Sequence, residues 1–530
     1  MKRTVISLAA LMLCLTMAAQ TASDACTSIM VGKDASTDGS VMTSHTCDSW
    51  YRTWMSVEPA HDYPRDTIMS VYDGLMHTEH STDMTGVKEK GQIPQAAHTY
   101  SFLNTAYPCL NEKQLGIGET TISGRDTLQN KDGMFMIEEL ARVALQRCTT
   151  AREAIRLMGQ LVKEYGYGDS GECLTIADPK EVWIFEIFGE GPKKIGGVWA
   201  AQRIPDDEIA VSANISRIGH IDPSDSDHFM TSDNVFDVAR KLKLWDGKSD
   251  FSFWKAYSGG NYYNEPKNYS VRELFIMQQV APSVGFTNDM EELPLSVRPE
   301  KKLSVEDVSR LLGSTYEGTE LSLASRIDSL SKGQEDVHYK GNTPMAANPW
   351  MRPDEIRLYA GLLNDSTMDN IRTVSVSWCA YSTVIQLRSW LPDAIGGVAW
   401  VALDCPGQSP RFPIFAGTTE LPMMLGICGQ HRLRDDAALT HFRGANRLAT
   451  IRWGQTRQSM QEAQQYFIDK GQRELPFVEN TWKTLQNDGD NTPTAATTFL
   501  NGYTADFFAS TVMKWDELYK RYWRQLWAGF

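Results

Sequence analysis

The residue of this chain best placed to do chemistry is Cys26, because the residues before it have the pattern of a removable leader. Lys2 and Arg3 form a short basic start, an apolar run covers residues 5–19, and Ser23-Asp24-Ala25 put small residues at the first and third positions before Cys26. This is the layout of a secretory signal with a small-x-small cleavage site. Cleavage after Ala25 would make Cys26 the first residue of an exported protein, periplasmic or secreted.

An N-terminal cysteine carries a thiol and a free α-amine on one residue. The α-amine has a pKa of roughly 7.7–8, so at neutral pH a usable fraction of it is unprotonated. It can take the thiol proton and later return it to a leaving amine. In the precursor the same nitrogen is an amide without this basicity, so cleavage would activate the nucleophile. Two alternatives stay open: Cys26 is an ordinary residue near the junction, or it carries a lipid anchor, which Asp24 fits poorly.

Composition excludes several classes of function. The chain has 530 residues with 42% hydrophobic and 10% aromatic residues, which is typical of a folded protein with a large core. Its net charge of −14 argues against a nucleic-acid partner. After the leader we find no apolar run of about 18 residues, so no membrane span is expected in the mature protein.

Cysteine and histidine are scattered along the chain. Its 9 cysteines and 10 histidines include no CxxC pair and no HExxH motif, so no metal and no cofactor are expected. Cys14 would leave with the leader. If Cys26 is a free nucleophile, the odd number of remaining cysteines leaves at least one more unpaired within the chain. Most are expected to be buried as small apolar residues.

The elements that must position Cys26 begin with a hairpin. Strands are predicted over residues 27–31 and 40–43, joined by a turn at Asp38-Gly39. Further strands are predicted as a hairpin-like pair around residues 115–118, at 173–177 and 182–187 on either side of Asp178-Pro179, and at 209–213, 373–376, 383–387 and 397–403. Helices are predicted at 134–145, 151–165, 234–244 and 271–279, and from Ser304, where Ser304-Val305-Glu306-Asp307 forms a capping box.

The chain shows no repeats and no low-complexity linker, so its parts are expected to pack as one body. Residues 1–25 form the removed signal, residues 26–434 form the main domain with a loop-rich helical middle, and residues 435–530 form a helical C-terminal region packed on it. Hairpins flanking a pair of helices indicate an α+β fold with two sheets covered by helices.

Several segments resemble one family in the same order. Cys26-Thr27-Ser28-Ile29-Met30-Val31-Gly32, followed by Asp38-Gly39-Ser40, resembles the mature start of the C69 dipeptidases. These are N-terminal-nucleophile hydrolases related to bile salt hydrolases and penicillin V acylases. Segments 111–121, 176–183, 213–218 and 388–397 are similar to the same family, and the resemblance runs from Cys26 to about Gly417 and more weakly through the tail. The resemblance is specific because several segments match in the same order and the first begins at a cysteine that follows a cleavage site.

The resemblance implies a four-layer αββα sandwich of the N-terminal-nucleophile hydrolase type, in which the nucleophile opens a central strand. The wider superfamily has an Arg and an Asp shortly after the cysteine. Asp48 matches the acid, which would hold the α-amine. His45 stands where many relatives have Arg, and this puts the fixed positive charge in doubt, because His is only partly charged at neutral pH. The alternative for His45 is an ordinary polar residue at a strand end.

Three further residues match site positions of the relatives. Asn214 matches an Asn that donates to the tetrahedral oxyanion, although a turn-forming Asn is the alternative. Thr121 lies ten positions after Asn111, where bile salt hydrolases place a second oxyanion residue, and a strand Thr paired across a sheet fits equally well. Arg272 lies in a segment, Tyr269-Ser270-Val271-Arg272, that loosely resembles one carrying a site Arg.

The predicted function is therefore an exported cysteine dipeptidase that cleaves dipeptides or small peptides through a thioester. The nearest alternative is an N-acyl amide hydrolase of the same fold, acting on a bile salt or a penicillin V-like amide. Segments 115–121 and 388–393 favour the dipeptidase branch. A non-catalytic exported binding protein that retains the fold is an alternative from another class. Whether the protein forms a homo-oligomer is left open.

Overall fold

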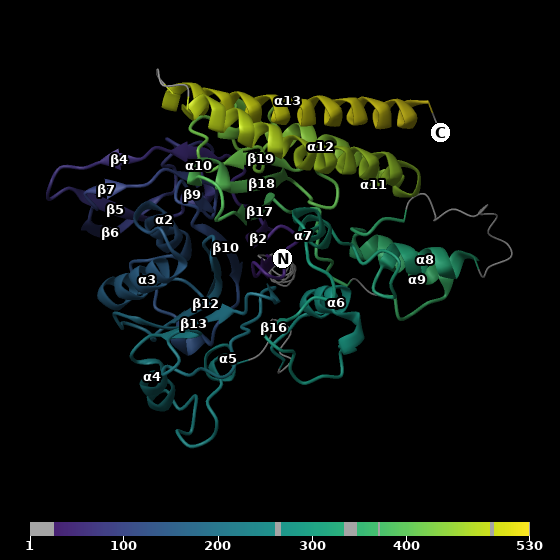
Figure 1. The fold of residues 1–530 in the computed structure, drawn as a ribbon. Coiled ribbons are helices and arrows are strands. Elements are labelled where there is room, and N and C mark those ends of the chain that lie inside the picture. Colours follow the sequence, from purple (N-terminus) through teal and green to yellow (C-terminus); the bar gives the residue numbers. More distant parts are fainter. Residues whose placement is uncertain (1–25, 260–266, 333–346, 369–370, 488–491, 529–530) are drawn as a thin grey trace, which may run out of the picture.

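Two antiparallel β-sheets form the centre of this computed structural model, which describes residues 26–259, 267–332, 347–368, 371–487 and 492–528 (Figure 1). The strand order of the first sheet is β16 (Ser296–Val297), β14 (Ile209–Ser212), β1 (Ser28–Val31), β2 (Val41–Cys47), β17 (Tyr381–Leu387), β18 (Gly397–Leu403) and β19 (Phe412–Phe415). That of the second is β15 (Phe229–Thr231), β13 (Gly197–Ile204), β12 (Val182–Gly189), β11 (Glu172–Ala177), β10 (Gly116–Thr121), β9 (Leu110–Asn111), β8 (Phe102–Asn104) and β3 (Ser56–Glu58). The predicted α+β class is confirmed, whereas the predicted leader lies outside the described residues.

Strand β1, which begins two residues after Cys26, is an inner strand of the first sheet. It pairs with β14 on one side and with β2 on the other. The predicted turn between β1 and β2 is present: Gly39 has φ +86°, which favours glycine, and the Asp38 carboxylate accepts a hydrogen bond from the Ser40 amide at 3.1 Å. Cys26 therefore sits at the start of a strand held on both sides.

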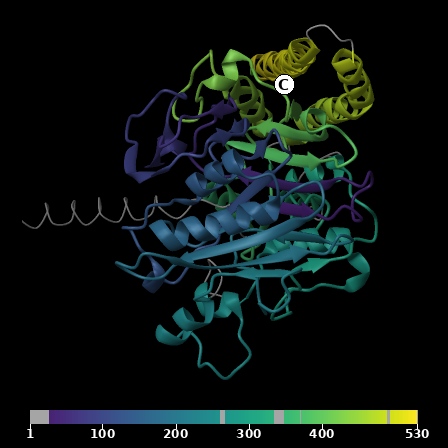
Figure 2. The ribbon, with the colours of Figure 1, turned by 60° about the vertical axis from the view of Figure 1, so that its left-hand side comes forward.

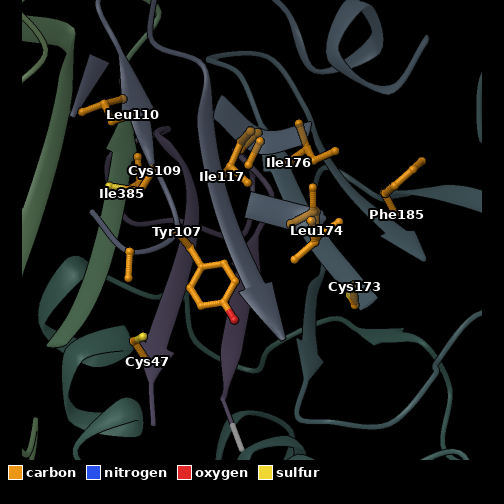
Figure 3. Packing of buried hydrophobic residues seen from close by; sticks show 14 of the residues in the cluster. Cys47, Tyr107, Cys109, Leu110, Ile117, Cys173, Leu174, Ile176, Phe185 and Ile385 are labelled. Atoms are coloured by element: carbon orange, nitrogen blue, oxygen red, sulfur yellow. The ribbon is translucent and has the colours of Figure 1, made fainter. Parts of the chain in front are cut away.

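The two sheets pack directly against each other, with β10 of the second sheet lying on β2 and β17 of the first. The approach is closest at Gly118, where an added Cβ would lie 2.2 Å from the Ser44 carbonyl oxygen. Figure 3 shows part of the core, with Ile117 and Ile176 of the second sheet and Ile385 of the first. The absence of a side chain at Gly118 of β10 thus allows the two sheets to pack closely at this point.

Helices cover the outer sides of both sheets (Figures 1 and 2). On the second sheet, α3 (Ala151–Tyr165) contacts β11, β12 and β13, and α2 (Ile137–Arg147) packs on α3 and contacts β8 and β9. On the first sheet, α6 (Val271–Val280) contacts β14 and α7 (Val305–Leu312) contacts β17. The tail forms α11 (Ala438–Ile451), α12 (Trp453–Asn487) and α13 (Thr492–Trp527), which contact β18 and β19.

The remaining elements are short and lie mostly in the middle of the chain. The helices are α4 (Val235–Lys241), α5 (Phe253–Tyr257), α8 (Leu323–Lys332), α9 (Pro353–Leu363) and α10 (Asp393–Gly396). Strands β4 (His61–Asp62) and β7 (His98–Thr99) form one small sheet, and β5 (Ile68–Asp73) and β6 (Lys88–Pro94) form another. None of the helices in the described part of the chain is long and apolar enough to cross a bilayer.

Local sequence signals account for many of these boundaries. Capping boxes begin α3 at Thr150, α6 at Ser270 and α7 at Ser304, the last as predicted. The strand predicted over residues 373–376 is wrong. The Ser375 amide donates to the Ser314 carbonyl at 2.9 Å, but the Ser375 carbonyl accepts from Trp350 Nε1 at 2.9 Å and from Thr373 Oγ1 at 2.5 Å instead of from a strand. All eight cysteines from Cys26 onward are buried, and none of them forms a disulfide within the described residues.

Replacing Gly118 by alanine tests the close approach of the sheets. The new methyl group would meet a backbone oxygen, which cannot rotate away, so overpacking should lower the free energy of unfolding by about 1–3 kcal/mol. Chemical denaturation followed by circular dichroism measures this change. Gly502→Ala is the control, because that exposed helical position has no atom within 4 Å of an added Cβ. Equal stability of the two variants would contradict the described packing.

Candidate active site

Cys26 is buried at the start of β1, and in this chain its nitrogen is still an amide joined to Ala25. Its sulfur, a ring nitrogen of His45 and a carboxylate oxygen of Glu119 lie within 4.8 Å of one another. The backbone N–H of Asp48 points at the sulfur. Burial, reinforced by the nearby Glu119 carboxylate, raises the pKa of the Cys26 thiol well above its ordinary value. In this form the thiol is neutral and a weak nucleophile.

Arg272, in the first turn of α6, connects the start of β1 to the end of β14. It donates to the Cys26 carbonyl at 2.7 Å and to Thr27 Oγ1 at 3.0 Å. Its other terminal nitrogen donates to the Asn214 Oδ1 atom at 2.8 Å and to the Ala213 carbonyl at 2.9 Å. Burial lowers the pKa of Arg272 to about 10, so the group stays charged at neutral pH. The structure thus brings this predicted residue to Cys26.

Asn214 and Thr121 continue this connection into the second sheet. Asn214 follows β14 with φ +65°, and its Nδ2 donates to the Thr121 carbonyl at 2.7 Å. Thr121 Oγ1 in turn donates to the Glu119 Oε1 atom at 3.3 Å. An amide NH2 group has two hydrogens, so Asn214 keeps one donor for another acceptor. Contacts therefore run from Cys26 through Arg272, Asn214 and Thr121 to Glu119, which again faces Cys26.

Asp48 lies on the other side of Cys26, one residue after β2. Its Oδ2 atom accepts from Thr46 Oγ1 at 2.8 Å and from Arg372 at 2.8 Å. Thr46 Oγ1 also accepts from the Thr27 amide at 2.9 Å, which links the carboxylate to the residue after the nucleophile. The Cys379 thiol lies beside Asp48. The buried Oδ1 atom has no partner with hydrogen-bond geometry in the described part of the chain, so it can accept one more donor.

His45 does not supply the fixed positive charge that relatives take from Arg. Its Nδ1 lies 2.6 Å from the Glu119 carbonyl oxygen, and its buried Nε2 has no hydrogen-bond partner among the described residues. Burial lowers the pKa of His45 to about 4, so the ring is neutral at pH 7. Arg272 and Arg372 are the cations bonded around Cys26 instead. Arg372 was not predicted, because it lies in a loop without a recognisable motif.

A pair of buried carboxyl groups, Glu119 on β10 and Glu172 on β11, was also not predicted. They lie close enough that each affects the pKa of the other. Burial raises the pKa of Glu119 from 4.5 to about 8, and burial together with Glu119 raises that of Glu172 well above its ordinary value. One sequence signal could have pointed to Glu119. It is a charged residue within the predicted strand segment Gly118-Glu119-Thr120, and buried strand positions normally hold apolar residues.

Two groups among the described residues have the ligand types and spacing to hold a metal ion. One group consists of Glu79, Cys428 and His431. In it, the His431 Nδ1 atom already lies 2.8 Å from the Glu79 Oε1 atom. The other consists of Cys26, His45 and Glu119. An ion there would take the Cys26 sulfur as a ligand, so it would block nucleophilic attack rather than assist it.

The pKa of Glu119 predicts how stability depends on pH. In the folded chain the carboxyl keeps its proton up to about pH 8, whereas in the unfolded chain it loses it near pH 4.5. The folded state therefore binds more protons between these values, and stability falls as the pH rises from 4.5 to 8. Glu119→Gln removes this titration, so the melting temperature of the variant should fall less between pH 5 and pH 8. The exposed Glu164→Gln is the control, and parallel profiles for wild type and Glu119→Gln would contradict the assignment.

Comparison with known proteins places this chain in a family. The family model of peptidase family C69 matches residues 25–466. A "probable dipeptidase" of Latilactobacillus sakei is 27% identical over 443 residues, 81% of this chain and 83% of the relative. A "probable dipeptidase" of Salmonella dublin is 26% identical over 74% of this chain and 81% of its own length, and a "probable dipeptidase B" of Streptococcus pyogenes serotype M1 is 26% identical over 77% and 75%. This chain, with Cys26 at the second matched position, belongs to peptidase family C69.

Proposed function

We propose that the protein is an exported cysteine dipeptidase whose nucleophile is the N-terminal Cys26 of the mature chain. The observation that carries the proposal is that Arg272 of α6 bonds both the Cys26 carbonyl and Asn214 after β14, while Asp48 after β2 lies beside the Cys26 sulfur. The family and the names of the relatives support dipeptide substrates. The two facing sheets, with helices on both outer sides, support an αββα sandwich of the N-terminal-nucleophile hydrolase type.

Cleavage after Ala25 creates the catalytic base in this mechanism. The new α-amine lies on the residue whose sulfur contacts the Asp48 amide, and the unpartnered Asp48 Oδ1 atom can accept a hydrogen bond from it. In its neutral form the amine takes the proton of the Cys26 thiol as the sulfur attacks the peptide carbonyl carbon. The resulting ammonium then gives this proton to the leaving amine, and a thioester remains on Cys26.

The oxyanion of the tetrahedral intermediate needs a donor that does not have to reorganise. Arg272 fixes the Asn214 Oδ1 atom and the Thr121 carbonyl fixes one of its Nδ2 hydrogens, so the amide plane is held on both sides. The second Nδ2 hydrogen is the oxyanion donor in this proposal. Water then attacks the thioester carbonyl with the α-amine again as base, which releases the acid product and the thiol.

We expect the exported protein to begin at Cys26 and Cys26→Ala to be matured but inactive. Signal peptidase accepts small residues around its cleavage site, so the substitution should not prevent processing. N-terminal sequencing and intact mass of the periplasmic or secreted fraction measure both points. If Cys26→Ala instead accumulates with Ser23-Asp24-Ala25 still attached, maturation occurs by self-cleavage.

Cys26→Ser should keep the fold and lose most turnover. A hydroxyl occupies nearly the space of a thiol, but its pKa is so much higher that the weakly basic α-amine cannot deprotonate it readily. Proton transfer of this kind contributes a factor of about 10²–10⁴, so kcat should fall by that order while KM changes little. Steady-state kinetics with a dipeptide measure the split.

Acetylation of the α-amine in the unmutated mature enzyme complements the Cys26→Ser variant, because it changes the base instead of the nucleophile. It removes the base and leaves the thiol, so the loss of kcat should be of similar order. Full activity after acetylation would assign the base to another group and would exclude the N-terminal-nucleophile mechanism.

A further inference from the structure

The buried carboxyl pair Glu119 and Glu172 has no counter-ion in the described part of the chain. Both side chains are at most 3% exposed, and each has an Oε2 atom without a hydrogen-bond partner. The nearby Asp169 adds further negative charge. Buried carboxylates in proteins are normally paired, because the loss of water costs several kcal/mol for each charge. Without a cation these two carboxyls keep their protons, and a cation that binds beside them would displace one proton.

The cations of the site are already bonded elsewhere. Arg272 donates to Cys26, Thr27, Ala213 and Asn214, and Arg372 pairs with Asp48. The His45 Nδ1 atom lies 3.9 Å from the Glu119 Oε2 atom, but burial keeps this ring neutral at pH 7. Two sources of positive charge beside Glu119 remain: the α-amine that cleavage creates on Cys26, which the mechanism assigns to Asp48, and a bound molecule.

The position of Glu119 fits one particular charge of a dipeptide. The α-nitrogen of a dipeptide lies two bonds from the scissile carbonyl carbon, which is about 2.5 Å with standard bond lengths. A nucleophile approaches that carbon at about 3–3.5 Å, so the ammonium must lie close to the Cys26 sulfur. A carboxylate oxygen of Glu119 lies within 4.8 Å of that sulfur. The other charged group of a dipeptide, its carboxylate, lies further from the scissile carbonyl carbon and has the same sign of charge as Glu119.

We propose that the free α-ammonium group of the substrate binds to the Glu119 carboxylate, while the Glu172 carboxyl keeps its proton. The inference rests on the proposed dipeptidase function and names how the same site recognises its substrate. Thr121 Oγ1 donates to the Glu119 Oε1 atom at 3.3 Å and leaves Oε2 for the ammonium. An N-acyl amide has no positive charge at this position, so it would leave the carboxyl pair unpaired. The site therefore selects peptides with a free N-terminus over N-acyl amides.

The test uses two substrates that differ in one group. Alanyl-alanine carries the ammonium, and propionyl-alanine carries a hydrogen in its place, so the ratio of their kcat/KM values isolates recognition of the ammonium. Mature wild type, Glu119→Gln and Glu172→Gln are compared. Glu186→Gln is the matched control, because Glu186 is a buried strand carboxylate that is bonded by Ser216 and Arg217 instead of facing Cys26. The rate of Cys26 alkylation by iodoacetamide reports on the nucleophile in every variant.

Wild type should prefer alanyl-alanine by about 10²-fold or more, because a buried polar site rejects a substrate that lacks its partner group. Glu119→Gln should lower this preference at least 10-fold, mainly through kcat/KM for alanyl-alanine, and Glu186→Gln should retain the wild-type ratio. An unchanged ratio in Glu119→Gln would overturn the inference. So would equal losses on both substrates with slower alkylation, which would make Glu119 the proton acceptor of the thiol instead.

Failure of the proposed function gives a different result. If mature wild type reacts with iodoacetamide and cleaves N-acyl amides but no free dipeptide, the dipeptidase assignment is wrong, and the ammonium site is wrong with it. If wild type cleaves both substrates equally well and Glu119→Gln does the same, the dipeptidase assignment stands and only the ammonium site is excluded.

Discussion

Polar groups that are kept away from water must find partners inside the protein, and this constraint organises the centre of the molecule. Cys26 begins an inner strand, so Asp48, Glu119 and Arg272 around it are all buried. Arg272 satisfies acceptors on both sides of the β1–β14 pair. Removal of one partner from such a network leaves another unpaired. The start of β1, the end of β14 and the first turn of α6 are therefore held as one unit, which fixes the sulfur relative to Asn214.

The charges around Cys26 are divided between two sides. On the Asp48 side, Arg372 and Thr46 compensate a carboxylate that still has one free acceptor atom. On the Glu119 side, the described chain supplies no cation, and Glu119 and Glu172 stay neutral because burial raises their pKa values and each carboxyl keeps its proton. This division matches two tasks in the proposed mechanism. One side holds the amine of the enzyme, and the other receives the amine of the substrate.

Local patterns predicted the hairpin at Asp38-Gly39 and the cap at Ser304, because each depends on neighbours within a few residues. Resemblance to a family placed Asp48, Asn214, Thr121 and Arg272 near Cys26, and the structure brings them together. Glu172 and Arg372 were missed, because what defines them is a partner on another strand, 53 or 324 positions away in the chain. The strand predicted at 373–376 failed for a similar reason, since Trp350 replaces the strand partner.

Maturation would change the electrostatics of a site that is already assembled. In the precursor, the pKa of the Cys26 thiol is raised by burial and by the Glu119 carboxylate, and the amide nitrogen of Cys26 brings no positive charge to offset them. Hydrolysis of one peptide bond places an amine on the same residue, and its protonated form favours the thiolate by Coulomb attraction. The Asp48 Oδ1 atom is free to accept from that amine, and Arg372 already holds Oδ2. Activation in the proposed mechanism therefore requires a change of charge at Cys26 and no rearrangement of the strands that carry it.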